Sequence, residues 1–216
     1  MAPRLLVAAL AIPGLVAAGA YAFVLADAGQ AAFDVDQLLE SAQPVPKSAR
    51  DVLLAKAEWV PSDPRLQETI GVLEMREGDG ALLADAGDRF AIALRRRPVS
   101  AQTWANVASQ KYRVGDTGPA FEKAFLNAAR LGPNEVGVQA ILANYGLALW
   151  PDLGPEMQAR TDAIVGRAIA RDPKEIMQIA QRRGRLQVAC RHFNSQPRRA
   201  DLAKWAETCQ SLEATS

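Results

Sequence analysis

The stretch PVSAQTWANVASQKYRVGDTGPAFEKAFLNAARLGP, residues 98–133, contains two amphipathic segments separated by a turn. In its second half apolar residues recur at three- and four-residue spacing, the period of a helix with one buried face; they are Phe121, Ala124, Phe125 and Ala128. Gly115-Asp116 interrupts the pattern near the middle, and a proline stands at each end. The stretch therefore predicts two antiparallel helices joined by a short turn.

Similar punctuation divides the rest of the chain, at Asp63-Pro64, Arg97-Pro98, Gly132-Pro133 and Asp172-Pro173. Proline suits the first turn of a helix and disfavours helix in the residue before it, so each pair is expected to end one helix and begin the next. Successive prolines of these pairs are 34, 35 and 40 residues apart. Periods near 34 indicate stacked helix–turn–helix units, each burying its apolar face against its neighbours.

The residues inside these units resemble the tetratricopeptide repeat. Trp104 lies six residues after Pro98, where that repeat has its leading Trp, and residues 107–108 (Val-Ala) stand where it has Leu and Gly. Ala120 occupies the place of the small residue in the second helix, and Pro133 closes the unit one residue late. The resemblance implies a right-handed solenoid of antiparallel helix pairs.

The predicted fold class is all-α. Alanine, the strongest helix former, is abundant, and no stretch alternates apolar and polar residues with the Val, Ile, Thr and Tyr content of strands. The expected organisation, in chain order, is a membrane anchor or uncleaved signal over residues 1–27, a linker over 28–47, a capping helix over 48–63, repeats over 64–184 and carboxy-terminal capping helices over 185–216.

An uncharged run of 22 residues extends from Leu5 to Ala26. As a helix it rises roughly 33 Å, about the thickness of a bilayer core, and it predicts one membrane span. Arg4 and the amino terminus precede the run, and this charge placement predicts that the amino terminus stays in the cytoplasm and that the body of the protein is exported. The alternative is a cleaved signal peptide, because residues 18–20 (Ala-Gly-Ala) form an acceptable cleavage site. Both interpretations export the body of the protein.

The sequence offers no motif for catalysis, for a cofactor or for a metal. His192, the one histidine, is interpreted as a half-exposed polar residue, and Cys190 is the only other metal-ligand type close to it. Walker, dinucleotide-binding and nucleophile motifs are not found. We therefore expect a protein that is not an enzyme and that uses no cofactor.

Two cysteines, Cys190 and Cys209, stand 19 residues apart with Pro197 between them. Antiparallel helices folding back around this proline would bring the two positions to similar heights. Outside the cytoplasm such a pair favours a disulfide. The alternative is two separate buried thiols, which behave as small apolar side chains.

Basic residues concentrate over residues 160–204, with 11 Lys and Arg against 4 Asp and Glu. One interpretation is a solvated face. The other is an anion-facing surface, whose ligands outside the cytoplasm would be lipid headgroups, acidic polysaccharide or an acidic protein; it would comprise Arg182, Arg183, Arg185, Arg191 and Arg198. Nucleic acid is not expected, because no aromatic stacking platform accompanies these arginines.

The repeat register also indicates partner-facing residues. With Trp104 as the fourth position of its unit, five polar side chains are expected on the concave wall of a solenoid: Glu68, Gln102, Ser109, Tyr112 and Asn144. The alternative is that these residues have structural roles, since repeat counting drifts where spacing is irregular. The tryptophans are interpreted as packing residues: Trp59, Trp104, Trp150 and Trp205.

The whole arrangement resembles a second, narrower family. An amino-terminal anchor, a few degenerate repeats and the segments WANVA (104–108), AARLGPNE (128–135) and RDPKEIMQIAQRRGRLQVAC (171–190) are similar to the Vps-type accessory proteins encoded with bacterial exopolysaccharide systems. The resemblance implies a non-catalytic inner-membrane scaffold that supports polymer synthesis or export and binds envelope proteins through its repeat groove. The alternative is a repeat adaptor for another envelope assembly process, such as cytochrome c maturation.

Overall fold

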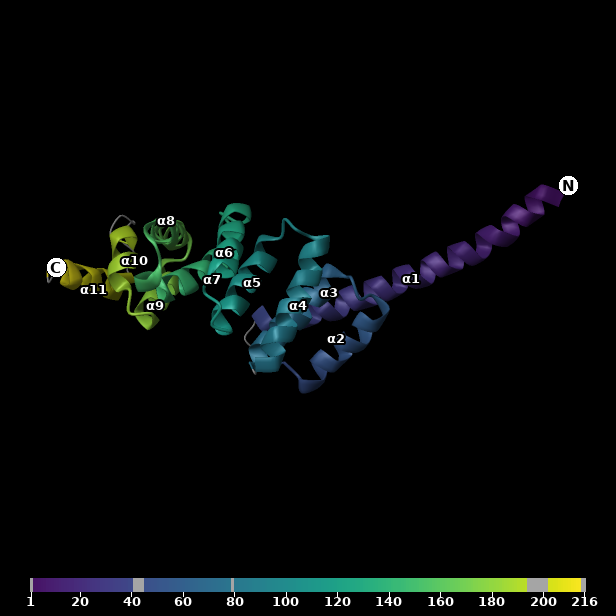
Figure 1. Ribbon diagram of the computed structural model, residues 1–216, viewed down its shortest axis with the longest axis horizontal. Helices are drawn as coiled ribbons and strands as arrows, with labels where there is room; N and C mark the ends of the chain where they lie inside the picture. Colours follow the sequence, from purple (N-terminus) through teal and green to yellow (C-terminus); the bar gives the residue numbers. More distant parts are fainter. Residues whose placement is uncertain (1, 41–44, 79, 194–201, 215–216) are drawn as a thin grey trace. The chain divides into compact units, whose positions relative to one another are not determined.

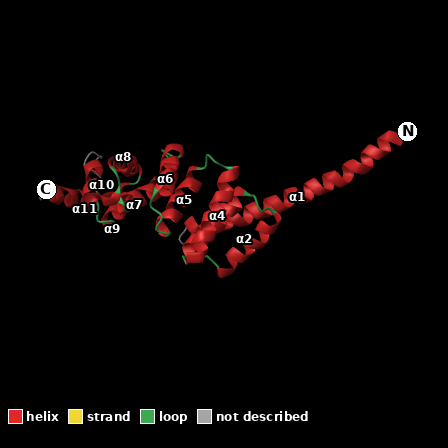
Figure 2. Ribbon diagram, in the orientation of Figure 1, coloured by secondary structure: helices red, strands yellow, loops and turns green. Residues whose placement is uncertain are grey.

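A computed structural model describes residues 2–40, 45–78, 80–193 and 202–214, with side chains from residue 16 onward except those of Glu40 and Lys47. Throughout these residues the regular secondary structure is helical and no strand is present (Figure 2). The all-α prediction is therefore confirmed for the described part of the chain. The chain forms two compact units, Met1–Pro98 (unit 1) and Val99–Ser216 (unit 2), so the unit boundary falls inside the predicted repeat array.

The described residues of unit 1 form four helices: α1 (Ala2–Glu40), α2 (Lys47–Trp59), α3 (Pro64–Glu77) and α4 (Gly80–Arg96). The carboxy-terminal half of α1 packs against α2 and α3, and α4 pairs with α3. The amino-terminal half of α1 extends beyond the other three helices (Figure 1). The apolar pattern predicts helices over 48–59, 66–76 and 81–96, which agree with the bounds of α2, α3 and α4 to within about two residues.

The predicted linker over residues 28–47 is wrong for residues 28–40, which continue α1. Ala28, Ala32 and Val35 fall on one face of the helix and are buried against α2 and α3, where Leu53 and Ile70 lie in the same core. Spacings of three and four residues put these small apolar side chains on a common stripe. Residues 41–44 of the expected linker lie outside the described part of the chain.

The first part of α1 differs from its second part in exposure. Val16, Tyr21 and Phe23 are exposed, at 67%, 57% and 75%, whereas Ala28 is buried. The structure contains one helical stretch, Val16–Leu39, that is long and apolar enough to cross a membrane by length and composition, counted over the described residues. The exposed apolar side chains lie within the run predicted to span the bilayer.

Unit 2 contains seven α-helices and one short 3₁₀ turn among its described residues: α5 (Ala101–Arg113), α6 (Pro119–Leu131), α7 (Val136–Ala148), η1 (Trp150–Asp152), α8 (Pro155–Arg171), α9 (Pro173–Arg182), α10 (Leu186–Phe193) and α11 (Ala203–Glu213). Consecutive helices pair as α5 with α6, α7 with α8 and α9 with α10. In addition, α7 contacts both α5 and α9, so the first helices of the three pairs lie next to each other.

Polar side chains set several helix starts. The Asp63 side chain accepts a hydrogen bond from the Leu66 backbone N–H at 2.8 Å, and Asp172 caps α9 in the same way. In both places the following proline is the first residue of the helix. At the other two X-Pro pairs the helix begins three residues after the proline, where the apolar pattern predicts it: α5 begins at Ala101 behind its cap Ser100, and α7 begins at Val136. Capping sets the start of α5, because the Ser100 hydroxyl accepts a hydrogen bond from the Thr103 N–H.

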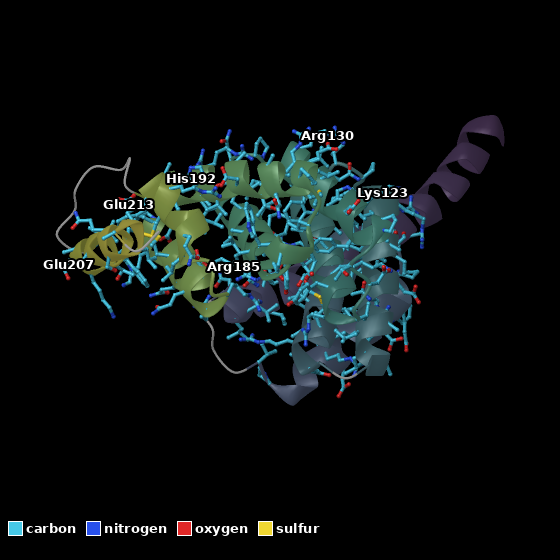
Figure 3. All side chains as sticks on the ribbon, turned by 60° about the vertical axis from the view of Figure 1, so that its left-hand side comes forward. Lys123, Arg130, Arg185, His192, Glu207 and Glu213 are labelled. Carbon is cyan, nitrogen blue, oxygen red and sulfur yellow. A yellow bond between two sulfur atoms is a disulfide. The ribbon has the colours of Figure 1, made fainter. Side chains whose placement is uncertain are left out.

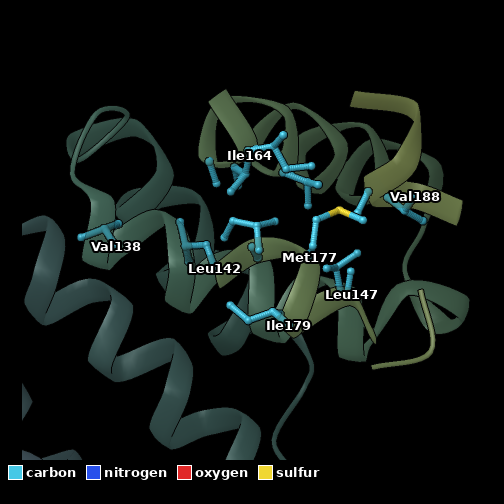
Figure 4. Close-up of a cluster of buried hydrophobic side chains, with 14 of the residues drawn as sticks. Val138, Leu142, Leu147, Ile164, Met177, Ile179 and Val188 are labelled. Carbon is cyan, nitrogen blue, oxygen red and sulfur yellow. The ribbon is translucent and has the colours of Figure 1, made fainter. Parts of the chain in front are cut away.

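The core of unit 2 lies between the helix pairs (Figure 4). Leu142 and Leu147 from α7 meet Ile164 from α8 and Met177 from α9, all of them buried. α7 and α8 approach closely at Gly146, where a Cβ atom would lie only 2.5 Å from the Thr161 methyl carbon. A residue with a side chain at this position would force the two helices apart.

The tryptophans do not all behave alike. Trp205 is buried in the core of unit 2, and Trp104 and Trp150 pack against that core while staying partly exposed. Trp59 is 74% exposed, so its interpretation as a packing residue is wrong. The buried face of α2 includes Ala57 and is continued by Val60, which leaves Trp59 on the other side.

A buried carboxyl group lies in unit 1. The Glu74 side chain on α3 is fully buried, with Arg89 at 3.6 Å and Arg50 at 3.7 Å from its Oε1 atom. Burial raises the pKa of Glu74 above its usual value of 4.5, although the two arginines lower it in part. An acid whose pKa is higher in the folded than in the unfolded state destabilises the fold as the pH rises through the interval between the two values.

Glu74→Gln is therefore expected to melt together with the parent protein near pH 4 and at a higher temperature near pH 7, by a few degrees. Thermal unfolding followed by circular dichroism at both pH values measures the difference. Glu77→Gln is the matched control, since the Glu77 side chain contacts the same Arg50 but is 44% exposed. A Glu74→Gln variant with no gain between the two pH values would contradict the expected destabilisation by the buried carboxylate.

Candidate functional site

A group of polar and aromatic side chains joins the first helices of the three pairs in unit 2. The Ser109 hydroxyl on α5 lies 2.7 Å from the Tyr145 hydroxyl on α7. The Tyr112 ring, one turn further along α5, lies 4.7 Å from the Tyr145 ring between centroids. These contacts connect α5 to α7 through one hydrogen bond and one ring pair.

Arg183 extends the same group towards the end of α9. Its Nε atom donates a hydrogen bond to the Asn144 side-chain oxygen at 2.9 Å, and its guanidinium lies 5.9 Å from the centre of the Tyr112 ring. A cation placed over an aromatic face is attracted by the ring quadrupole. We name the five connected residues the tyrosine cluster: Ser109, Tyr112, Asn144, Tyr145 and Arg183.

The solvent exposure of its side chains determines whether the tyrosine cluster can bind a partner. Ser109 is buried at 7%, while Tyr112, Asn144, Tyr145 and Arg183 are all half-buried. Tyrosine and arginine are among the residue types enriched at the energetic centres of protein interfaces. The arrangement has the chemistry of a binding surface, with a hydroxyl, an amide and a guanidinium around two aromatic rings.

The structure brings together three of the five predicted partner-facing residues, namely Ser109, Tyr112 and Asn144. Gln102 lies on α5 as well, but its side chain donates to Asn106 at 3.2 Å instead of joining the cluster. Glu68 lies in unit 1 and forms an ion pair with Arg97 at 2.6 Å. Sequence reasoning missed Tyr145, although it directly follows the predicted Asn144.

The structure describes four of the five arginines of the predicted basic surface. Arg183 belongs to the tyrosine cluster, Arg182 is exposed at the end of α9, and Arg198 lies outside the described residues. Arg185 and Arg191 line one open hollow of about 430 Å³, together with Trp150, Pro151, Gln187 and Val188. Figure 3 labels Arg185 in this α9–α10 region.

Turn geometry places Arg185 at the hollow. Gly184 adopts a left-handed conformation with φ of 64°, which ends α9 and lets the Arg185 N–H reach the Ala180 carbonyl at 2.8 Å. Arg191, one helix further on, lies 5.8 Å from the Trp150 ring centre and pairs with Asp162 at 2.8 Å. Asp162 also lies 3.0 Å from His192 Nε2, so part of the positive charge around the hollow is neutralised from α8.

A disulfide joins Cys190 on α10 to Cys209 on α11, with the Cα atoms 5.3 Å apart. Both cysteines are buried in the core of unit 2, beside Trp205 and Leu202. The bond therefore attaches the last described helix to the helix stack. The intervening Pro197 lies outside the described residues.

Ligands for a metal ion do not gather in the described parts of the chain, where no group of three or more His, Cys, Asp or Glu side chains could hold one. No family model and no curated protein matches this sequence. The candidate functions below therefore depend on the residues and contacts described above.

Proposed function

We propose that the chain is a membrane-anchored adaptor that binds an envelope protein through the tyrosine cluster and has no catalytic role of its own. The observation that carries the proposal is the cluster itself, because it connects α5, α7 and α9 by polar and aromatic contacts on half-buried side chains. A solenoid of tetratricopeptide type would present such first-helix residues along its concave wall. Helical repeat proteins commonly use that wall for binding.

The amino-terminal half of α1 is the proposed anchor. Its exposed Val16, Tyr21 and Phe23 are suited to lipid, and Arg4 before the run favours an amino terminus in the cytoplasm with units 1 and 2 in the bacterial periplasm. The disulfide also supports a location of unit 2 outside the cytoplasm, because such bonds persist in oxidising compartments. A retained span also agrees with the way α1 continues without a break into the core of unit 1.

The process that we propose for this adaptor is the synthesis or export of an exopolysaccharide. Its support is the resemblance of the anchor, the repeats and the segment at residues 171–190 to Vps-type accessory proteins. In that role the tyrosine cluster would hold a protein of the polymer-assembly machinery close to the inner membrane.

A genetic experiment tests the proposal. Deleting the gene is expected to lower surface polysaccharide, and the parent gene should restore it. Tyr112→Ala combined with Arg183→Ala should fail to restore it, because truncating two such side chains weakens an interface by about 3 kcal/mol or more, over a hundredfold in affinity. Lys123→Ala, an exposed change on α6, is the matched control and should complement fully.

Immunoblots and melting temperatures of the purified variants must show that both proteins accumulate and fold as the parent does. Complementation by the double variant would show that the tyrosine cluster is not the binding surface. If the deletion left polysaccharide unchanged and instead lowered the amount of c-type cytochromes, the exopolysaccharide role would be replaced by the cytochrome-maturation alternative.

A further inference from the structure

One end of unit 1 lies beside the point at which the apolar half of α1 leaves the core of the unit. Followed from its carboxy-terminal end towards its amino terminus, α1 packs against the core of unit 1 as far as Val24. The preceding residue, Phe23, is 75% exposed. Asp27, three residues after Val24, forms an ion pair with Lys56 in the last turn of α2. The carboxy-terminal end of α2 is therefore held beside the point where α1 leaves the unit.

Trp59, the last residue of α2, stands at this end with 74% of its surface exposed. It follows Lys56 by less than one helical turn, so it lies close to the level of Asp27 on α1. A large apolar ring with a polar N–H group is poorly suited to bulk water. It is well suited to the headgroup region of a bilayer, where tryptophan is enriched in membrane proteins.

Two arginines lie at the same end. α3 leads away from the turn after Trp59, and α4 returns, so that Arg96 donates a hydrogen bond to the Ser62 hydroxyl at 3.1 Å. Arg95 and Arg96 line an open hollow of about 470 Å³ whose other lining residues are Pro61, Ser62 and Ile92. A patch of this composition combines positive charge with apolar side chains.

Neighbouring carboxylates are mostly engaged elsewhere. Asp27 pairs with Lys56, Glu68 pairs with Arg97, and Asp63 caps α3. Within the described ranges, no ion pair of Arg95 or Arg96 with a carboxylate is present, while Glu58 beside Trp59 is exposed and opposes part of the charge. The surface around Arg95 and Arg96 therefore remains positively charged.

We propose that this end of unit 1 lies on the bilayer surface, with Trp59 in the headgroup region and with Arg95 and Arg96 bound to the phosphates of anionic phospholipids. The inference rests on the membrane anchor of the proposed function and adds a second contact beyond the span. Continuity with α1 supplies the closeness to the membrane. Charge complementarity between the two guanidinium groups and lipid phosphates supplies the preference for anionic lipid.

Tryptophan quenching tests the contact in the full chain reconstituted into phosphatidylglycerol-containing vesicles whose acyl chains carry bromine. The expected result is that Trp59→Phe loses most of the bromine-dependent quenching, because Trp104, Trp150 and Trp205 lie in unit 2 and pack against its core. Trp150→Phe is the matched control and should keep it. Persistent quenching in Trp59→Phe would overturn the inference.

The arginines are tested in the same vesicles. Arg95→Gln with Arg96→Gln should reduce the quenching of Trp59, and vesicles of phosphatidylcholine alone should reduce it in the parent as well. Arg76→Gln, an exposed change at the far end of α3, should leave it unchanged. Equal quenching in both lipids and in all variants would show that the arginines do not bind anionic headgroups.

Extraction at alkaline pH separates this inference from the anchor itself. Protein that stays with the vesicles but shows no Trp59 quenching retains the anchor and rejects the second contact. Protein released into the supernatant rejects the anchor, and with it both proposals.

Discussion

Replacing Phe121 by alanine is expected to lower the free energy of unfolding by roughly 3–5 kcal/mol. Phe121 lies on the buried face of α6, has no exposed surface and packs 5.7 Å from Phe125 between ring centres. Removing the ring takes away its apolar burial and leaves a cavity between α5 and α6, which the surrounding helices can fill only in part. Urea unfolding followed by tryptophan fluorescence and by circular dichroism measures the change.

Val99→Ala is the control for this experiment, because Val99 belongs to the same unit but is 73% exposed. Its effect should stay within about 0.5 kcal/mol. If the two variants unfolded at the same urea concentration, the assignment of Phe121 to the core of unit 2 would be wrong.

Removing the disulfide by changing both Cys190 and Cys209 to alanine is expected to lower the free energy of unfolding by about 3 kcal/mol. The cysteines close a loop with a sequence separation of 19, and the cross-link restricts the unfolded chain more than the folded one. Equilibrium unfolding of the periplasm-expressed parent and of the double variant gives the difference.

Mass spectrometry provides the covalent readout for the same protein. Without reductant the parent should be lighter than its reduced form by two hydrogen atoms, and its cysteines should resist alkylation. Two readily alkylated thiols in the native parent would show that the bond does not form. The α10–α11 contact would then depend on the packing of Trp205 and Leu202 alone.

Local signals in the sequence were sufficient to predict most of the helices. Pro119 and Pro155, together with the periodic apolar residues that follow them, predict helices over 119–131 and 155–171, which are the bounds of α6 and α8. The helix starts at Ala101 and Val136 were predicted from the apolar pattern as well, and at the first of them Ser100 caps the helix. The continuation of α1 through residues 28–40 was missed, since its buried stripe consists mainly of alanine and carries little hydrophobic signal.

The candidate site was less predictable than the helices. Ser109, Tyr112 and Asn144 followed from the repeat register, but Arg183 was assigned to a basic surface because charge alone was considered. Its position over Tyr112 depends on the contacts of α7 with both α5 and α9, and on the turn at Gly184 that ends α9. The boundary between the units at Pro98 has no sequence signal that distinguishes it from the other proline pairs.

Because α1 continues unbroken into unit 1, it limits how far the unit can move away from the amino-terminal half of that helix. A flexible tether of the 20 residues at 28–47 would allow excursions of about 25 Å from its attachment point. With residues 28–40 packed into the core of unit 1, that freedom is largely removed, and in the proposed anchored arrangement the unit would turn and tilt together with the amino-terminal half of α1. Under the proposed function, a partner held in the same bilayer would meet unit 1 at a high effective concentration and within a narrow range of heights above the membrane, whereas a molecule free in solution would gain no such advantage.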